Sequence, residues 1–158
     1  MTLAEKLLRK LSDWQPAGDG RHSLSAAFPD AGWTAHLTAD KADTLSCLVW
    51  EFTLSRTGSP TEGLTLRSWA EAIAKRASGL MEPLKVLEVD EVRGEAVLRS
   101  DSPAKKGERV MYYEVRLHGL TLAIARRFAA TRTASGREQI PFALTHEALA
   151  KLADDIVG

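Results

Sequence analysis

Residues 108–130 contain two runs of alternating apolar and polar side chains, and this pattern restricts the fold more than any other stretch of the chain. In the first run the apolar positions are Met111, Tyr113, Val115 and Leu117. In the second run they are Leu120, Leu122, Ile124 and Phe128. A period of two is typical of a half-buried strand. The sequence therefore predicts a β-hairpin with a two-residue turn at 118–119, where a glycine can adopt positive φ.

A two-residue turn also fixes which residues of this hairpin face each other. Leu117 is then opposite Leu120, Val115 opposite Leu122, and Tyr113 opposite Ile124, so the apolar partners share one face. We expect that face to be the core. The other face has a floor of small side chains, namely Thr121, Ala123 and Ala125. Its frame consists of Tyr112, Glu114, Arg116 and Arg127.

The rest of the chain supplies three helices and further strands. Residues suited to cap helices precede three segments with apolar side chains at helical spacing. The expected caps and helices are Thr2 before residues 3–13, Thr65 before residues 66–78, and Thr145 before a final helix. Alternating runs predict strands over 22–28, 33–39, 45–56, 85–92 and 95–101, besides the hairpin. Ile140, Phe142 and Leu144 add one short strand, which Pro141 restricts to an edge.

Short connections between neighbouring strands favour antiparallel pairing. We therefore predict one α+β domain over residues 1–158, with a two-layer architecture and the order α-βββ-α-ββββ-α. Its mostly antiparallel, meandering sheet has about seven strands, covered on one face by the three helices. Phe28 should pair with Trp33 across the turn at 29–32, and Trp33, Trp50 and Trp69 should all lie in the core.

Composition argues against several classes of partner and location. Twenty-one basic and twenty-one acidic side chains balance, so no global field favours nucleic acid or an anionic membrane. No apolar run approaches the ~20 residues that a membrane helix needs. The single cysteine, Cys47, forms no internal disulfide and is expected to be a buried, inert thiol. These features predict a cytoplasmic protein.

Residue types that carry catalysis or bind metals are scattered along the chain. The four histidines lack metal-binding spacing, and no nucleophile or phosphate-binding motif occurs, so we assign no catalytic residue, metal or cofactor. His118 and His146 are expected to be exposed. His36 is of more interest because it should lie in mid-strand opposite Ser25 on the polar side of the sheet. The basic cluster is interpreted as solvated arginines: Arg126, Arg127, Arg132 and Arg137.

Three parts of the chain together suggest a family. They are the helix over residues 3–13 followed by three strands, the middle helix around Trp69, and the closing segment REQIPFALTHEAL at 137–149. In this order of elements the chain resembles the bacterial type III secretion chaperones and their cytoplasmic relatives of the YbjN kind. That resemblance implies a small homodimeric binding protein without catalysis. The same order also resembles the Mog1/PsbP-like domains, which are again binding modules.

The expected function is therefore a non-enzymatic module, similar to a chaperone or adaptor, that binds a protein or peptide partner as a homodimer. The polar face of the central hairpin is the expected docking surface, unless a helix of the same chain covers it. The expected binding residues are Tyr112, Glu114, Arg116, Arg127 and His36. The alternative is a small-ligand-binding protein or an enzyme that uses His36, Glu51 or the arginines around a pocket on the polar sheet face.

Overall fold

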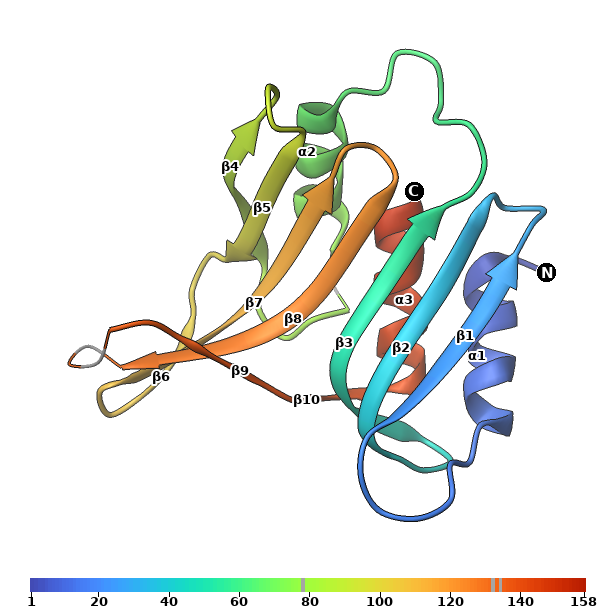
Figure 1. Ribbon diagram of the computed structural model, residues 1–158, viewed down its shortest axis with the longest axis horizontal. Helices are drawn as coiled ribbons and strands as arrows, with labels where there is room; N and C mark the ends of the chain where they lie inside the picture. Colours follow the sequence, from blue (N-terminus) through green and yellow to red (C-terminus); the bar gives the residue numbers. More distant parts are fainter. Residues whose placement is uncertain (78, 132, 134) are drawn as a thin grey trace.

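The computed structural model describes residues 1–77, 79–131, 133 and 135–158. Within these residues, three helices lie on one side of an antiparallel sheet of ten strands (Figure 1). The predicted α+β class is confirmed. The additional strands are short: β6 (Ala104–Lys106) was not expected, whereas β9 (Glu138–Ile140) and β10 (Phe142–Thr145) form on either side of Pro141, where one short strand is predicted.

The long strands follow the order β1-β2-β3-β8-β7-β5-β4 across the sheet. Their bounds are β1 (His22–Phe28), β2 (Trp33–Ala42), β3 (Ser46–Arg56), β4 (Leu84–Asp90), β5 (Glu95–Ser100), β7 (Arg109–His118) and β8 (Leu122–Thr131). The helices are α1 (Leu3–Asp13), α2 (Leu66–Arg76) and α3 (His146–Val157). The predicted end of the second helix at residue 78 lies outside the described residues.

All three predicted helix caps are confirmed. The hydroxyl of Thr2 accepts a hydrogen bond from the backbone N–H of Glu5 at 3.1 Å, and the Glu5 carboxylate accepts one from the backbone N–H of Thr2 at 2.9 Å. The hydroxyls of Thr65 and Thr145 each accept one from the N–H three residues later, at 3.0 Å. Each cap satisfies a donor that the first helical turn leaves without a partner.

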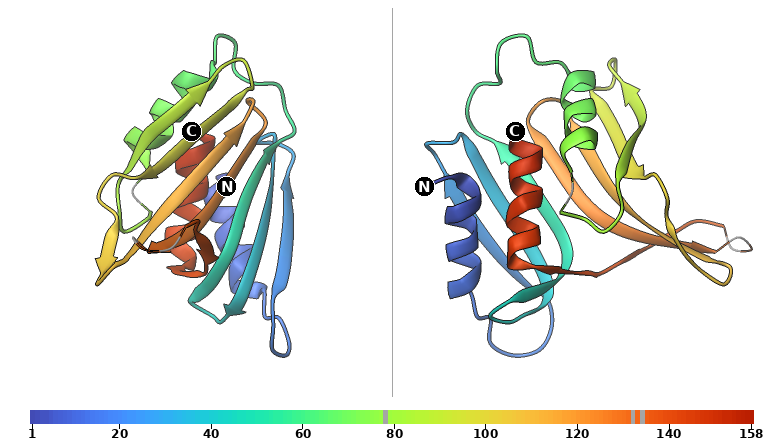
Figure 2. Two further views of the ribbon diagram at one scale, coloured as in Figure 1. Left: turned by 60° about the vertical axis from the view of Figure 1, so that its left-hand side comes forward. Right: turned by 180° about the vertical axis from the view of Figure 1, so that it is seen from behind.

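The core lies between the helices and one face of the sheet, and α1 and α3 lie side by side on that face (Figure 2). Trp69 of α2 is buried and donates its indole N–H to the carbonyl of Ile156 at 2.9 Å. Arg76, at the end of α2, donates to the carbonyl of Asp155 at 3.1 Å. These two bonds satisfy carbonyls in the last turn of α3 and fix α3 against α2.

The first hairpin has the predicted register. Phe28 is paired with Trp33, and Ser25 with His36. Phe28 and Trp33 are both buried in the core, as expected. The predicted and observed registers agree because this hairpin has large apolar residues on only one of its two faces.

The register of the β7–β8 hairpin differs from the predicted register. The turn has three residues, Gly119 to Thr121, so Leu117 pairs with Ala123 and Val115 with Ala125. The shift is an odd number of residues and therefore exchanges the two faces of β8. Ala123 and Ala125 lie in the core, whereas Ile124 is half-buried on the opposite face.

Arg56, at the end of β3, provides a physical reason for this longer turn. Its backbone N–H donates to the carbonyl of Thr121 at 2.7 Å, and its guanidinium Nε donates to the carbonyl of Leu120 at 2.7 Å. Gly119 adopts φ of +54° and donates its N–H to the carbonyl of Gly94 at 2.6 Å. The neighbouring strand and turn therefore stabilise a conformation that the local sequence does not predict.

The alternation of buried residues in β3 also differs from the prediction. A register shift at Trp50 places Thr38 opposite Glu51 and Ala39 opposite Val49. One extra residue inverts the alternation, so Val49 is buried and Trp50 is half-buried. The guanidinium of Arg21 lies 3.8 Å from the centre of the Trp50 ring. The prediction that Trp50 belongs to the core is therefore wrong, whereas Trp33 and Trp69 do lie there.

The predictions for Cys47 and for His146 have opposite outcomes. Cys47 is buried, as expected. Burial raises the pKa of the Cys47 thiol to about 11, with a smaller contribution from the charge of Asp43. His146 is buried rather than exposed, because it is the first residue of α3, directly after β10, where the chain packs against the β2–β3 turn. Its backbone N–H donates to the carbonyl of Leu45 in that turn at 2.8 Å.

The strands β9 and β10 fill a split in the sheet. β3 pairs with β8 only over residues 52–55 and 122–125, and the two strands then separate. β9 pairs with β8 and β10 pairs with β3, on either side of Pro141. The side-chain amide of Gln139 donates to the carbonyl of Trp50 at 2.8 Å across this split. The segment therefore joins the two halves of the sheet.

Candidate functional site

The side of the sheet opposite the helices is its open face, because none of the three described helices covers it (Figures 1 and 2). Side chains that are directly opposed in adjacent antiparallel strands point to the same face. One such row crosses six strands. From β1 to β5 it consists of Ser25, His36, Thr53, Ile124, Arg116 and Val97. This row defines the middle of the open face.

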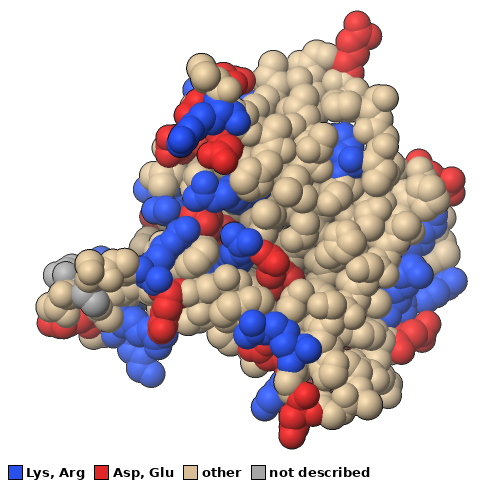
Figure 3. All heavy atoms as spheres, viewed as in Figure 1, with Lys and Arg blue, Asp and Glu red and all other residues tan. Residues whose placement is uncertain are grey.

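The open face divides into a region with few charges and a region rich in charges. Lys, Arg, Asp and Glu gather on the lower and left parts of this face in Figure 3, whereas its centre and upper right are mostly uncharged. Leu122 and Ile124 of β8 are half-buried on the open face, directly opposite Ser55 and Thr53 of β3. Large aliphatic side chains thus lie on the uncovered side of the sheet, next to the hydroxyl groups of β3.

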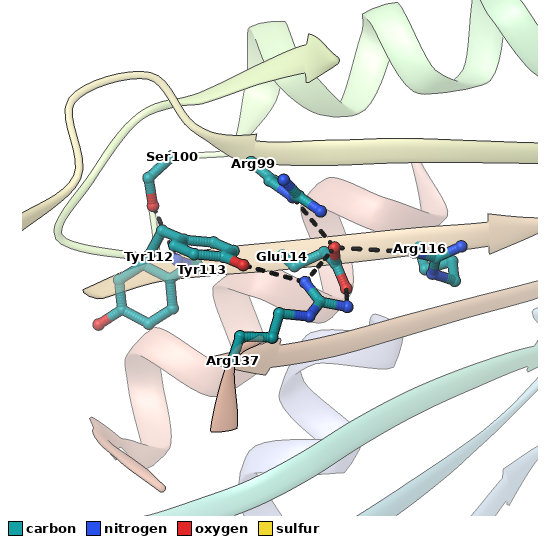
Figure 4. A network of polar contacts seen from close by, with 7 residues as sticks. All are labelled: Arg99, Ser100, Tyr112, Tyr113, Glu114, Arg116 and Arg137. Atoms are coloured by element: carbon teal, nitrogen blue, oxygen red, sulfur yellow. Dashed lines mark hydrogen bonds and ion pairs between the residues drawn. The ribbon is translucent and has the colours of Figure 1, made fainter. Parts of the chain in front are cut away.

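Glu114 is the centre of the charged region. Its carboxylate is almost fully buried, with 1% of the side chain exposed. Arg137 donates to it at 2.9 and 3.4 Å, and Arg99 donates through Nε at 3.1 Å. Arg116 forms an ion pair with it at 3.8 Å. Figure 4 shows the three guanidinium groups converging on this single carboxylate from β5, β7 and the segment before β9.

The arginines keep Glu114 ionised. Burial of the carboxyl by itself raises its pKa, but the hydrogen bonds and charge of Arg137, followed by those of Arg99 and Arg116, have a larger opposite effect. The pKa of Glu114 therefore lies below its ordinary value. Three guanidinium groups around one carboxylate leave two positive charges uncompensated within this cluster. We call Glu114, Arg99, Arg116 and Arg137 the arginine cluster.

Aromatic rings support the arginine cluster from the sheet. The guanidinium of Arg137 lies 3.6 Å from the centre of the Phe128 ring, and that of Arg99 lies 5.1 Å from Tyr112. The Tyr112 and Phe128 rings are 6.0 Å apart, and Arg137 donates to the Tyr112 hydroxyl at 3.1 Å. Stacking on rings and sharing a carboxylate both restrict guanidinium groups, so the cluster is ordered before any partner binds.

The structure places four of the five predicted binding residues on the open face. Tyr112, Glu114 and Arg116 alternate along β7 there, as expected, and His36 lies in the same row as Arg116. His36 is exposed and its Nδ1 is 2.8 Å from the hydroxyl of Ser25. It is three strands away from Arg116, about 14 Å at ordinary strand spacing, so it is not part of the arginine cluster.

Arg127 is the exception among the predicted binding residues. It is paired with Tyr113, whose side chain is buried in the core, and its guanidinium lies 4.1 Å from the Tyr113 ring. It also pairs with Glu82 at 3.2 Å. The odd shift of the hairpin register moves Arg127 to the helix side of the sheet. The predicted floor of Ala123 and Ala125 moves with it, and Leu122 and Ile124 take its place.

Two other arginines of the basic cluster, Arg126 and Arg137, also have carboxylate partners. Arg126 donates to Glu51 of β3 at 2.7 Å, so it is paired with a strand carboxylate and is not simply solvated. Arg137 belongs to the arginine cluster and is not simply solvated. Arg132 lies outside the described residues. The contacts of Arg99 and Arg137 with Glu114 are not predictable from local patterns, because these residues are 15 and 23 positions away from it in the sequence.

A pocket of about 530 Å³ lies away from the arginine cluster, between residues 16–22 and the β2–β3 turn. Two of its carboxylates have structural partners. The Asp43 carboxylate accepts hydrogen bonds from the N–H groups of Leu45 and Ser46, which lower its pKa, and Asp40 pairs with Arg21 at 2.7 Å.

Residues 1–77, 79–131, 133 and 135–158 contain no group of three or more His, Cys, Asp or Glu side chains placed to hold a metal ion. None of the helices among them has the length and apolar character needed to cross a bilayer.

No family model, curated protein or solved structure matches this chain. The resemblance to type III secretion chaperones and to YbjN-like proteins is therefore untested and stays a prediction. The open face itself is therefore the feature from which a function can be inferred.

Proposed function

We propose that this protein is a non-enzymatic binding module that docks a protein or peptide partner on the open face of its sheet and acts as a homodimer. The observation that carries the proposal is the combination of half-buried Leu122 and Ile124 with an ordered arginine cluster, on a face that the described helices leave uncovered. Large aliphatic side chains on an uncovered face favour association, and ordered charges beside them give it specificity.

The arrangement resembles the anatomy of protein interfaces. Such interfaces combine an apolar centre with aromatic and arginine side chains and a polar rim. Here Leu122 and Ile124 supply the centre, Arg116 lies directly opposite Ile124 on one side, and the hydroxyl groups of Thr53 and Ser55 lie on the other side. Binding also costs less entropy when the arginines are already held by Glu114 and by rings.

Site-directed photo-crosslinking tests the docking face. A photoreactive phenylalanine analogue replaces Thr53, which is directly opposite Ile124, and in a control chain it replaces Arg67, which is exposed on α2. We expect the Thr53 position to give an adduct with a partner that the Arg67 position does not give. The purified partner should then bind the wild-type chain and lose affinity for Arg116→Ala. Adducts of equal yield at both positions, or none at Thr53, would contradict the proposal.

The homodimer is tested separately by sedimentation velocity at micromolar concentration. We expect a species of twice the 17.3 kDa chain mass. A monomer at these concentrations would remove the dimer from the proposal and leave the docking face to the crosslinking experiment.

A further inference from the structure

We propose that the partner segment docked on the open face is an acidic, amphipathic peptide whose carboxylates bind Arg99 and Arg116 while a neighbouring apolar side chain covers Ile124. This inference rests on the proposed function and adds the chemistry of the partner. Its basis is the charge of the arginine cluster and the distance between that cluster and the apolar centre.

Charge complementarity determines the sign of the partner. The arginine cluster carries two positive charges in excess, and the three guanidinium side chains are 34%, 28% and 31% exposed for Arg99, Arg116 and Arg137. Because these groups are held close to one another, their mutual repulsion falls when an anionic group binds between them. A carboxylate is the protein group that relieves this repulsion and matches the fork of a guanidinium.

Donor atoms also remain for such a carboxylate. Arg99 uses Nε for Glu114, and its two terminal nitrogens donate to no acceptor among the described residues. Arg116 forms only the longer ion pair with Glu114, at 3.8 Å, and makes no hydrogen bond within that same part of the chain. Arg137, by contrast, is engaged by Glu114 and Tyr112. Arg99 and Arg116 are therefore the residues that we expect to bind the partner.

The apolar centre begins one strand away from these donors. Arg116 is directly opposite Ile124, and directly opposed side chains have Cβ atoms about 5 Å apart. A partner segment therefore needs an acidic and an apolar side chain within one or two residues of each other. Free inorganic phosphate can bind the arginines but cannot cover Ile124. A surface that combines arginine donors with an apolar side chain therefore favours a peptide.

Fluorescence anisotropy with defined peptides tests this inference. The probe is a labelled 12-residue peptide in which Glu and Leu alternate, with one serine between each Glu and the next Leu. Matched peptides replace every Glu by Gln or every Leu by Ser. We expect the Glu–Leu peptide to bind at least about tenfold more tightly than either, since each loses one half of the contacts. Raising the salt from about 0.05 M to about 0.5 M should weaken its binding, because salt screens exposed charges.

Protein variants locate the site. Arg116→Ala should weaken binding of the Glu–Leu peptide by at least about tenfold, whereas Arg67→Ala, which removes the same charge from α2, should not. The comparison of the three peptides and the salt dependence both use the wild-type protein. A folding defect in Arg116→Ala therefore does not decide the result.

Two outcomes would overturn the inference. Equal binding of the Glu and Gln peptides would show that the open face docks apolar segments without regard to charge, which leaves the proposed function intact. Displacement of the Glu–Leu peptide by inorganic phosphate at equal molar concentration would instead show a simple anion site. Failure of the proposed function has a different signature, namely no adduct at Thr53 with any partner.

Discussion

Glu114 shows how one buried carboxylate organises a surface. Its 1% exposed side chain has two arginine hydrogen-bond partners and a third arginine at ion-pair distance. A carboxylate in this position is stable only while those partners compensate the loss of water. Residues from three separate segments therefore depend on a single side chain for their positions.

Glu114→Gln should lower the free energy of unfolding by about 1–3 kcal/mol, because a buried group loses charge-assisted hydrogen bonds. Glu138→Gln is the matched control, since Glu138 is 71% exposed and pairs with Arg109 on the surface. That change should stay within about 0.5 kcal/mol. Urea unfolding at pH 7 measures both values. Equal losses for the two variants would contradict the central position of Glu114.

The same carboxylate should make stability depend on pH. Because the pKa of Glu114 is lower in the folded than in the unfolded chain, its contribution is present above the unfolded pKa of about 4.3 and is lost as pH falls through the folded value. We expect the wild-type chain to lose more stability between pH 5 and the acid limit than Glu114→Gln does. Urea midpoints of both chains across this interval provide the comparison, and parallel curves would refute the expectation.

Cys47 should react slowly in the folded protein. Burial raises its thiol pKa to about 11, so very little thiolate is present near pH 8, and the sulfur is also inaccessible. We expect modification by a chromogenic disulfide reagent at pH 8 to be at least about a hundredfold slower in buffer than in urea. A rate in buffer close to that in urea would indicate an accessible thiol.

At the scale of elements, the β7–β8 hairpin decides which groups reach the open face. Both faces of β8 carry apolar residues, with alanines on one face and larger side chains on the other. The three-residue turn held by Arg56 directs Ala123 and Ala125 to the core, opposite the fully buried Leu117 and Val115. Small residues opposite large ones fill the layer without overcrowding.

Ala125→Leu should therefore lower the free energy of unfolding by about 1–3 kcal/mol, because the core has no room for three more carbon atoms. The same substitution at Ala27, which is exposed on β1, should change it by less than about 0.5 kcal/mol. Thermal or urea unfolding distinguishes the two variants. If Ala125→Leu were tolerated as well as Ala27→Leu, the register predicted from the sequence pattern would be favoured instead.

At the scale of the whole molecule, the three helices occupy one side and the open face results from that arrangement. α3 is central because it contacts both α1 and α2. The loop after α2 approaches it closely at Gly79, where an added Cβ would lie 2.7 Å from the carbonyl oxygen of Ala148 and 3.2 Å from the N atom of Leu152. Its packing against α3 therefore excludes a side chain at this position.

Gly79→Ala should lower the free energy of unfolding by about 1–3 kcal/mol, since both close atoms belong to the backbone of a packed helix. The sign of the effect is informative. Without the close approach, replacing this glycine would stabilise the protein by about 0.4–1 kcal/mol, because the unfolded chain would lose conformational freedom. Urea unfolding that shows a gain would contradict the packing of the loop on α3.

The sequence by itself determined the features that depend on neighbouring residues. Helix caps, the order of elements and the pairing of Phe28 with Trp33 follow from contacts within a few positions, and local patterns contain that information. The position of Tyr112, Glu114 and Arg116 on one face of β7 was predictable for the same reason, since alternation within one strand needs no partner.

Only the tertiary structure decided which face of β8 meets the helices and which arginines meet Glu114. Apolar groups lie on both faces of β8, so periodicity cannot choose between them, and the choice depends on Arg56 and on a core already filled by Leu117. The extra residue at Trp50 inverts β3 in the same way. Contacts between distant segments, such as those of Arg99 and Arg137, exist only after these registers are set.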